Sequence, residues 1–244
     1  MRTYAIGDIH GYLDQLDAAH RLIAEDRARV GDRYAPVIHI GDLVDRGPDS
    51  RGVIARLHSG ILKGEPWIVL KGNHDRMFIS FLLDPDDCDP GTSLHWTHPR
   101  IGGAETLASY GVRGAEERPR AEVYEEVLDA IPADHATFLN GLRTAHLRGG
   151  TLFVHAGIRP GVPLADQRED DLLWIRGTFH DDRRDHGVLV VHGHTPVAEV
   201  THYGNRVNID TGAGYGKDVA TVVIEDGRVW QLVPGGRRAI RREG

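Results

Sequence analysis

The amino-acid sequence predicts an α/β protein in which two mixed β-sheets pack face to face as a central β-sandwich flanked by helices. In the first half, short apolar runs at residues 3–6, 37–40 and 67–70 alternate with segments of helical periodicity. In the second half, strands follow one another, and turn residues at 203–206 and 226–227 join them into hairpins. A βα-alternating half followed by a mainly β half indicates two sheets that share one core.

Helices are expected where apolar residues recur at every third or fourth position. Asp49 or Ser50 can cap the second helix, and Pro132 lies near the start of the sixth. The expected helices cover residues 13–31, 50–58, 77–83, 104–110, 123–128, 136–139 and 172–176. The expected strands of the second half cover residues 144–147, 151–154, 188–191, 200–202, 207–209, 219–224 and 229–233.

We expect a single domain over residues 1–234, followed by a basic C-terminal tail at residues 235–244. An acidic, proline-containing stretch at residues 84–89 ends the third helix and opens an insertion that extends to about residue 120. The insertion is expected to lie over the functional site and to shape its substrate range. The arginine-rich tail is expected to be a frayed terminus.

The composition is that of an ordinary globular protein, with 40% hydrophobic and 27% charged residues among 244. The 29 basic and 36 acidic residues give a formal charge of −7, which argues against binding to nucleic acid. No apolar run approaches the length of a membrane span, and a strand that begins by Thr3 leaves no room for a signal peptide. The single cysteine, Cys88, cannot form an internal disulfide. We therefore expect a cytoplasmic protein without a membrane or nucleic-acid partner.

Five apolar runs end in the same way, in a short stretch that contains glycine and carboxylate, imidazole or amide side chains. Each pattern alone is compatible with a structural role, because Asp and Asn also stabilise turns. Five of them in one chain, at strand ends that meet at one edge of an α/β sheet, favour a shared metal site. The five stretches are residues 7–11, 41–47, 72–75, 155–157 and 192–195.

The donor atoms in these stretches are carboxylate oxygens, imidazole nitrogens and an amide oxygen, which suit manganese, iron or zinc. More donors are present than one ion needs, and a carboxylate can bridge two ions. Two cations about 3.5–4 Å apart are a known arrangement for in-line displacement at phosphorus, where they acidify water and neutralise phosphoryl oxygens. The sequence thus predicts two divalent ions, with Mn²⁺ favoured over Fe or Zn. Two arginines, Arg46 and Arg176, are available to bind the oxygens of a phosphoester in bidentate fashion.

The same stretches, in their order and spacing, resemble the signature blocks of the PPP family of Ser/Thr protein phosphatases. That family is part of the calcineurin-like metallophosphoesterases, whose fold is the one expected above. The resemblance covers about residues 3–215 and is closest to the short bacterial and phage-type members. The matching blocks are GDIHG (7–11), GDLVDRG (41–47), GNHD (72–75), HAG (155–157) and GHT (193–195).

The resemblance also implies which residues hold the two ions. Three side chains match the ligands of the first ion, and one of them, Asp42, matches the carboxylate that bridges to the second. The implied ligands are Asp8, His10 and Asp42 for the first ion, and Asp42, Asn73, His155 and His194 for the second.

Four further residues match side chains that act on the substrate. Arg46 and Arg176 match the arginines that bind the phosphate, His74 matches the general acid, and Asp45 matches the carboxylate that orients it. The chemistry supports the last pair, because an alkoxide is a poor leaving group and proton delivery contributes ~10²–10⁴-fold in such sites. Asp75 stands where eukaryotic members usually carry Glu, and we expect it to support the site without reacting.

These assignments predict a metal-dependent Ser/Thr protein phosphatase, in which hydroxide generated at the dinuclear centre attacks a phosphorylated protein or peptide. The alternatives are a symmetrical dinucleoside tetraphosphate hydrolase and a broad small-molecule phosphoesterase or phosphodiesterase. The tetraphosphatase branch typically has Ala where this chain has Asp45, which favours the phosphatase. A metal-bound scaffold without activity is disfavoured, because every ligand and both arginines are present. The eukaryotic regulatory extensions are absent, so we expect no regulatory subunit.

Overall fold

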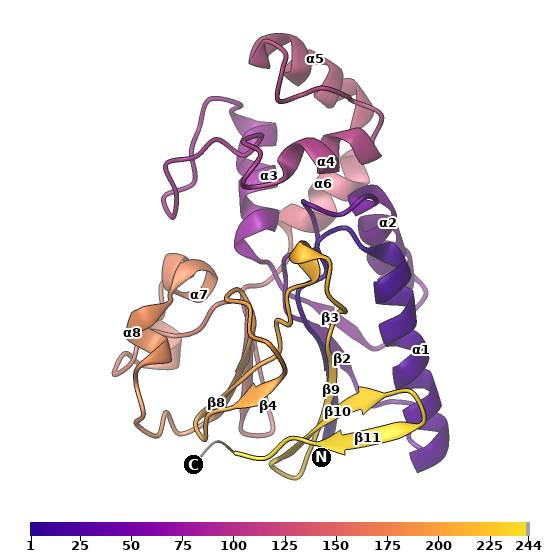
Figure 1. The fold of residues 1–244 in the computed structure, drawn as a ribbon, viewed down its shortest axis with the longest axis vertical. Coiled ribbons are helices and arrows are strands. Elements are labelled where there is room, and N and C mark those ends of the chain that lie inside the picture. The colour runs from indigo at the N-terminus through magenta and orange to yellow at the C-terminus, as the bar shows by residue number, and fades with distance from the viewer. Residues whose placement is uncertain (243–244) are drawn as a thin grey trace.

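The fold of residues 1–242, the part of the chain that the computed structural model describes, is a sandwich of two mixed sheets flanked by helices (Figure 1). In the first sheet, three strands from the start of the chain run parallel, and three strands from its end pair antiparallel beside them. The strand order is β11 (Gly236–Ala239), β10 (Arg228–Val233), β9 (Thr221–Glu225), β1 (Arg2–Ile6), β2 (Val37–His39) and β3 (Trp67–Val69).

The second sheet has three parallel strands with an antiparallel strand at each edge. Its strand order is β4 (Ala145–Arg148), β5 (Thr151–Val154), β6 (Leu189–His192), β8 (Arg206–Asn208) and β7 (Thr201–His202). The pairs β4–β5 and β7–β8 are the expected hairpins. The two mixed sheets predicted from the sequence are therefore confirmed.

Alternate side chains of each strand enter different cores, because successive strand residues point to opposite faces. In β1, Ala5 lies in the core between the two sheets, whereas Tyr4 and Ile6 pack under the helices. In β5, Phe153 lies between the sheets, whereas Leu152 packs on the outer face of the second sheet. All five side chains are buried. Strands covered on both faces read as continuous apolar runs, which explains why the sequence pattern identified them.

The helices form three groups around the sandwich (Figure 1). α1 (Leu13–Val30) and α2 (Ser50–Leu62) cover the first sheet, and α7 (Glu169–Trp174) and α8 (Gly177–His180) lie beside the second. A helical layer lies beyond the ends of the strands. It contains α3 (Asn73–Leu83), α4 (Gly103–Ser109), α5 (Arg120–Ala130) and α6 (Ala133–Asn140).

Helix α2 begins as predicted, with the Asp49 side chain accepting a hydrogen bond from the backbone N–H of Gly52 at 2.8 Å. It continues past the expected end at residue 58, through a glycine that suggested a break. That glycine, Gly60, lies against the ring of Trp67, where a Cβ would come within 1.9 Å of the indole. Close packing on the sheet therefore stabilises a helical turn that local propensity disfavours.

The expectation of a frayed terminus at residues 237–242 is wrong for residues 237–239, which belong to β11 (Gly236–Ala239) on the edge of β10. Arg237 donates to both carboxylate oxygens of Asp26, at 2.6 and 2.8 Å, and to Glu225 at 2.8 Å. Arg237 therefore has carboxylate partners on α1 and β9. Residues 243–244 of the expected tail lie outside the described part of the chain.

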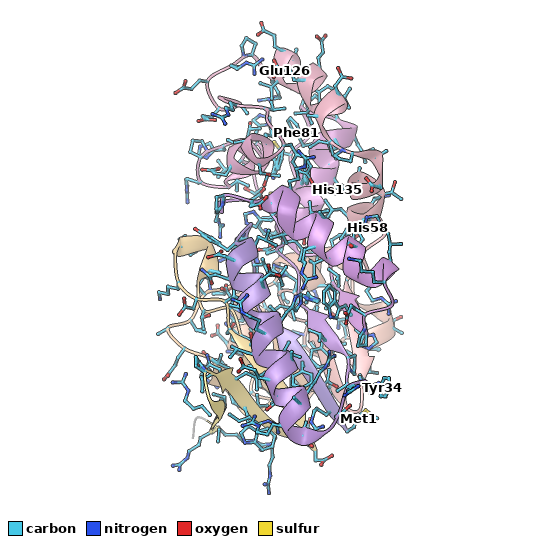
Figure 2. The ribbon with its side chains drawn as sticks, turned by 90° about the vertical axis from the view of Figure 1, so that its right-hand side faces the viewer. Met1, Tyr34, His58, Phe81, Glu126 and His135 are labelled. Carbon is cyan, nitrogen blue, oxygen red and sulfur yellow. The ribbon has the colours of Figure 1, made fainter. Side chains whose placement is uncertain are left out.

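The segment over residues 84–120 joins the helical layer through an aromatic cluster. Trp96 stacks on Phe78 with ring centroids 4.7 Å apart and lies 4.9 Å from the ring of Phe81. Figure 2 shows Phe81, with His135, in this helical layer, far from Met1 at the opposite end of the molecule. Across residues 1–242, no helix combines the length and apolar character needed to cross a membrane.

Candidate active site

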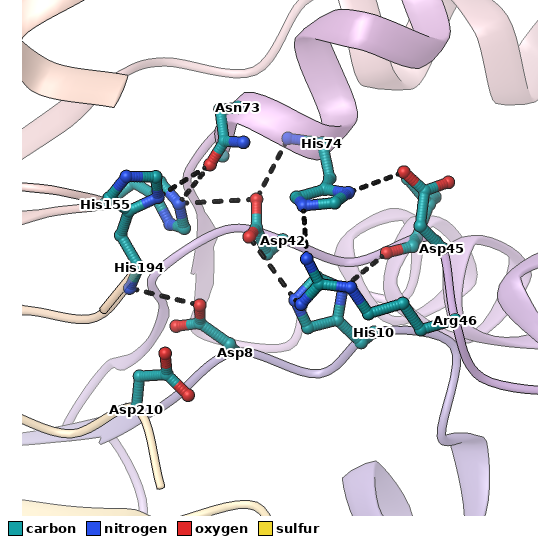
Figure 3. Close-up of polar contacts among 12 residues, drawn as sticks. Asp8, His10, Asp42, Asp45, Arg46, Asn73, His74, His155, His194 and Asp210 are labelled. Atoms are coloured by element: carbon teal, nitrogen blue, oxygen red, sulfur yellow. Dashed lines mark hydrogen bonds and ion pairs between the residues drawn. The ribbon is translucent and has the colours of Figure 1, made fainter. Parts of the chain in front are cut away.

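The carboxyl ends of parallel strands from both sheets meet at one edge of the sandwich, as the sequence pattern indicated. The loop after β1 carries Asp8, the loop after β2 carries Asp42, and α3 begins with Asn73 just after β3. The second sheet contributes His155 after β5 and His194 after β6. Figure 3 shows these five side chains directed toward one another. Each of them is 7% exposed or less.

Asp42 lies between two groups of metal-type donors. Its Oδ2 is 3.5 Å from Nε2 of His10, and its Oδ1 is 3.3 Å from Nε2 of His155. The backbone N–H of His74 donates to Oδ1 at 3.0 Å and fixes the carboxylate. Two sets of three donors each lie within 4.8 Å of one another, namely His10, Asp42 and His74, and Asp42, His155 and His194. Asp42 belongs to both sets, as a ligand that bridges two cations must.

Backbone carbonyls orient the two imidazoles that face Asp42. Nδ1 of His10 donates to the carbonyl of Val44 at 2.9 Å, and Nδ1 of His155 donates to the carbonyl of Ile40 at 3.1 Å. A proton on Nδ1 leaves a lone pair on Nε2, directed at Asp42. Metal-binding histidines are commonly held by such a second hydrogen bond.

Asn73 completes the donor set on the side of the second sheet. Its Oδ1 lies 2.9 Å from both Nε2 of His155 and Nδ1 of His194. Within residues 1–242, two buried atoms here have no hydrogen-bond partner: Oδ1 of Asp8 and Nε2 of His194. Buried polar atoms without partners are rare unless a ligand satisfies them. The donors present therefore fit two divalent cations of oxygen- and nitrogen-binding type.

The electrostatics of the site also fit cations. Burial, together with the charges of Asp210 and Asp42, raises the pKa of Asp8 well above its ordinary value. Burial also raises the pKa of Asp210 to about 6. Burial lowers the pKa of His10 and of His155, so both rings are neutral at neutral pH. Neutral imidazoles can coordinate a metal, and divalent cations would offset the repulsion among the carboxylates.

Backbone strain is concentrated in the site loops. Among residues 1–242, six residues other than glycine have positive φ, and five of these carry the site. Non-glycine residues in this region cost of order 1–3 kcal/mol each, and persist only where the surrounding structure holds them. The five are His10 (48°), Asp42 (50°), Asp45 (75°), Arg46 (69°) and His194 (67°).

Two glycines of the motifs are needed because the carboxylates of Asp8 and Asp42 approach their backbone. A Cβ on Gly193 would lie 2.0 Å from Oδ1 of Asp8, and a Cβ on Gly72 would lie 2.1 Å from Oδ1 of Asp42. Asp75 supports the second of these contacts, since its carboxylate accepts the backbone N–H groups of Gly72 and Leu43 at 2.7 and 2.9 Å. It ties the loop after β2 to the start of α3.

His74 and Asp45 form a buried pair beside the metal-type donors (Figure 3). Nδ1 of His74 donates to Oδ2 of Asp45 at 2.6 Å. Arg46 donates to Nε2 of His74 at 3.1 Å and to Nε2 of His10 at 3.0 Å. In this arrangement Nδ1 of His74 is the donor and Nε2 is the acceptor. The same Nε2 is the atom that would carry the proton of a general acid.

A cavity of about 450 Å³ opens over these groups. Arg46 and Arg176 both line it, so two guanidinium groups share one space with the metal-type donors. Residues from the 91–101 stretch form part of its wall, together with Trp174 and Tyr215. The guanidinium of Arg46 lies 4.9 Å from the ring centroid of Tyr215. The cavity therefore combines positive charge with exposed aromatic surface.

The structure brings together the ten residues that the sequence singled out. Seven of them line the cavity, and Asp8, Asp45 and His155 contact those seven from behind. Their catalytic and metal-binding roles are a separate question from this placement. The seven that line the cavity are His10, Asp42, Arg46, Asn73, His74, Arg176 and His194.

Sequence reasoning missed a sixth strand end. Asp210 follows β8, is 3% exposed and lines the same cavity (Figure 3). Its signal was present, because residues 207–209 are a short run that leads into Asp-Thr-Gly, like the other five stretches. Trp96 and Thr106, which contact Asp45, carried no such signal.

Comparison with known proteins identifies related sequences along most of the chain. The chain is 29% identical over 234 residues to the asymmetrical bis(5'-nucleosyl)-tetraphosphatase PrpE of Anoxybacillus flavithermus, covering 86% of this chain and 85% of that protein. It is 26% identical over 232 residues to serine/threonine-protein phosphatase 1 of Salmonella typhimurium, covering 91% and 92%. Among solved structures, the cold-active protein-tyrosine phosphatase of a Shewanella species has the same fold, with a TM-score of 0.65 at 16% identity over 98% of this chain and 80% of that one.

The family model for calcineurin-like phosphoesterases matches residues 1–224. This match covers the second sheet, strands β1, β2 and β3 and most of β9 of the first sheet, and all the loops that carry the metal-type donors. The chain therefore belongs to the calcineurin-like phosphoesterases, a family of metal-dependent phosphoester hydrolases.

Proposed function

We propose that the chain is a phosphomonoesterase that acts on phosphoserine or phosphothreonine and depends on two divalent cations, with Mn²⁺ the preferred metal. When bound, the cations supply Lewis acidity, which lowers the pKa of water and neutralises phosphoryl oxygens. Asp42 would be shared between them. Asp8 and His10 would complete one coordination sphere, and Asn73, His155 and His194 the other.

The hydrogen bond between His74 and Asp45 is the observation that carries this proposal. At 2.6 Å in a buried setting, it fixes the ring and stabilises a second proton on Nε2. The alkoxide of serine or threonine is strongly basic and needs a proton as it leaves. A nucleotide leaving from a phosphoanhydride is far less basic and gains less from an acid. The preassembled His74–Asp45 pair thus favours a phosphate ester of an alcohol as the substrate.

The arginines would bind the phosphoryl group. Arg46 donates hydrogen bonds to Nε2 of His74 and to Nε2 of His10. Coordination at His10 and protonation at His74 would each remove an acceptor from Arg46. The guanidinium would then be available for phosphoryl oxygens, together with Arg176 across the cavity.

Asymmetrical cleavage of dinucleoside tetraphosphates is the second candidate, favoured by the names of relatives at 28–29% identity. The lining of the cavity supports it, because Arg100, Trp174 and Tyr215 add charge and ring surface beyond what one phosphate needs. The choice between Ala and Asp at position 45 concerned the symmetrical branch and does not distinguish this substrate, whereas the His74–Asp45 pair favours the ester of an alcohol over it.

A direct comparison of hydrolysis rates on different substrates distinguishes the two candidate functions. Rates would be measured with Mn²⁺ on a phosphoserine peptide, diadenosine tetraphosphate and a cyclic nucleotide, with products resolved by chromatography. The proposal predicts the highest kcat/KM on the phosphopeptide. A higher kcat/KM on diadenosine tetraphosphate, with ATP and AMP as products, would establish the second candidate in its place.

A further inference from the structure

We propose that Trp96 and Thr106 are positioning residues for the acid: they hold the carboxylate of Asp45, and through it the ring of His74. Both lie in the 84–120 segment, outside every signature block. The inference deepens the proposed function and rests on the role of His74 as general acid. It assigns to this segment a part in the chemical step as well as in the shape of the cavity.

Three donors converge on one carboxylate. The indole N–H of Trp96 lies 2.9 Å from Oδ2 and 3.1 Å from Oδ1 of Asp45. The hydroxyl of Thr106 donates to Oδ1 at 2.8 Å, and Nδ1 of His74 donates to Oδ2 at 2.6 Å. Asp45 and Thr106 are fully buried, and Trp96 is 3% exposed. Both oxygens are therefore held by fixed protein donors.

The backbone sets the direction of the threonine hydroxyl. The backbone N–H of Asp45 donates to Oγ1 of Thr106 at 2.8 Å and also approaches Oγ of Ser50 at 3.2 Å. Because Thr106 accepts this N–H, its own hydrogen is free to point to Oδ1 of Asp45. One side chain thus binds both the backbone and the carboxylate of the same residue, which suits a positioning role.

The same segment holds the strained dipeptide that carries Asp45 of the acid pair and Arg46, the arginine proposed to bind the phosphoryl group. Asp45 and Arg46 have φ of 75° and 69°, in the left-handed region. The backbone N–H of Arg46 donates to the carbonyl of Gly102 at 3.1 Å. Thr106 and Gly102 therefore hold the two residues in a conformation that they would otherwise leave.

The consequence concerns proton delivery. As the P–O bond breaks, its electron pair stays on the leaving oxygen, and the proton on Nε2 of His74 moves to that oxygen. Nε2 is aimed correctly only if Asp45 holds Nδ1 in place. A carboxylate that lost Trp96 or Thr106 would rotate or take up water, and the ring would turn with it. The loss would fall on substrates with basic leaving groups.

The test uses Trp96→Phe and Thr106→Val in the full chain loaded with Mn²⁺. Phenylalanine keeps the stacking on Phe78 but removes the donor, and valine keeps the shape of threonine. The kcat would be measured on p-nitrophenyl phosphate and on alkyl phosphates. Matched controls are Trp230→Phe, on β10, and Thr221→Val, whose buried hydroxyl has no hydrogen-bond partner within residues 1–242.

We expect kcat on alkyl phosphates to fall by about 10-fold or more, and kcat on p-nitrophenyl phosphate to change by less than about 3-fold. Thr106→Ser, which keeps the hydroxyl, should restore the alkyl rates. Equal losses on both substrate types would show a merely structural role and overturn the inference.

His74→Asn distinguishes the possible failures. One outcome is that His74→Asn lowers kcat much more on alkyl phosphates than on p-nitrophenyl phosphate, while Trp96→Phe and Thr106→Val lower it equally on both. The positioning role is then wrong, and the role of His74 as general acid is retained. If His74→Asn also lowers kcat equally on both substrate types, the role of His74 as general acid is wrong, and this inference fails with it.

Discussion

Nδ1 of His74 lies 2.6 Å from Oδ2 of Asp45, in a pair whose side chains are 5% and 0% exposed. A hydrogen bond of this length between imidazole and carboxylate is charge-assisted and holds the ring in one orientation. The ring also lies close to Asp42 and His10, within one of the two groups of potential metal donors. Its position is thus compatible with an acid or a ligand, and the two roles predict different results on substitution.

Replacement of His74 by Asn should lower kcat on an alkyl phosphate by ~10²–10⁴-fold, because the leaving alkoxide loses its proton donor. Metal content, measured by elemental analysis of the purified protein, should be unchanged. A parallel loss of metal and activity would identify His74 as a ligand, contrary to the role proposed for it.

Gly193→Ala should abolish activity through metal binding, because a Cβ would lie 2.0 Å from Oδ1 of Asp8. The expected result is loss of bound metal with a circular dichroism spectrum like that of the parent. Gly141→Ala is the matched control, since its nearest neighbour would be the carbonyl oxygen of Thr137, 3.3 Å from the Cβ, at an ordinary φ of −78°. Full metal content in the Gly193→Ala variant would contradict this prediction, because it would show that Asp8 can move without loss of metal binding.

Removal of one arginine proposed to bind the phosphoryl group should weaken substrate binding while the metal remains. Arg176→Ala is expected to lower kcat/KM by about 10–10²-fold, the loss of one charge-assisted hydrogen bond or two. Inhibition by inorganic phosphate should weaken in parallel. Arg184→Ala, an exposed arginine paired with Asp182, is the control. Unchanged inhibition by phosphate would remove Arg176 from the proposed site.

The ion pairs of Asp26 should make the fold sensitive to acid. Burial raises the pKa of this carboxyl, but hydrogen bonds from Arg237, Tyr4 and Arg29 outweigh burial and lower it from 3.8 to about 2. A depressed folded-state pKa stabilises the protein above about pH 4, and this contribution is lost as the pH falls toward 2.

Asp26→Asn should therefore lower the free energy of unfolding at pH 7 by roughly 2 kcal/mol, and the difference from the parent should shrink between pH 4 and pH 2. Denaturant unfolding across this pH range is the measurement. Asp17→Asn, which removes the exposed partner of Arg56, should have a much smaller effect. Equal effects of the two substitutions would mean that β11 is not held through Asp26.

Much of the fold and the position of the site followed from sequence because both are local patterns. A buried strand followed by glycine and a metal-type donor, as at Gly7 and Asp8, is contained in a few consecutive residues, and the strand ends then meet by topology. The contacts of Asp45 with Trp96 and Thr106 span 51 and 61 residues and depend on how an irregular segment folds. Strand β11 was missed for a similar reason, since its Arg237 pairs with Asp26, which is 211 residues away.

The shared carboxylate of Asp42 is the central claim, and anomalous diffraction from crystals of active protein grown with Mn²⁺ tests it most directly. We predict two anomalous peaks, one on each side of that carboxylate, the first bound also by His10 and the second by His155. A single peak, or two peaks with no contact to Asp42, would contradict the account.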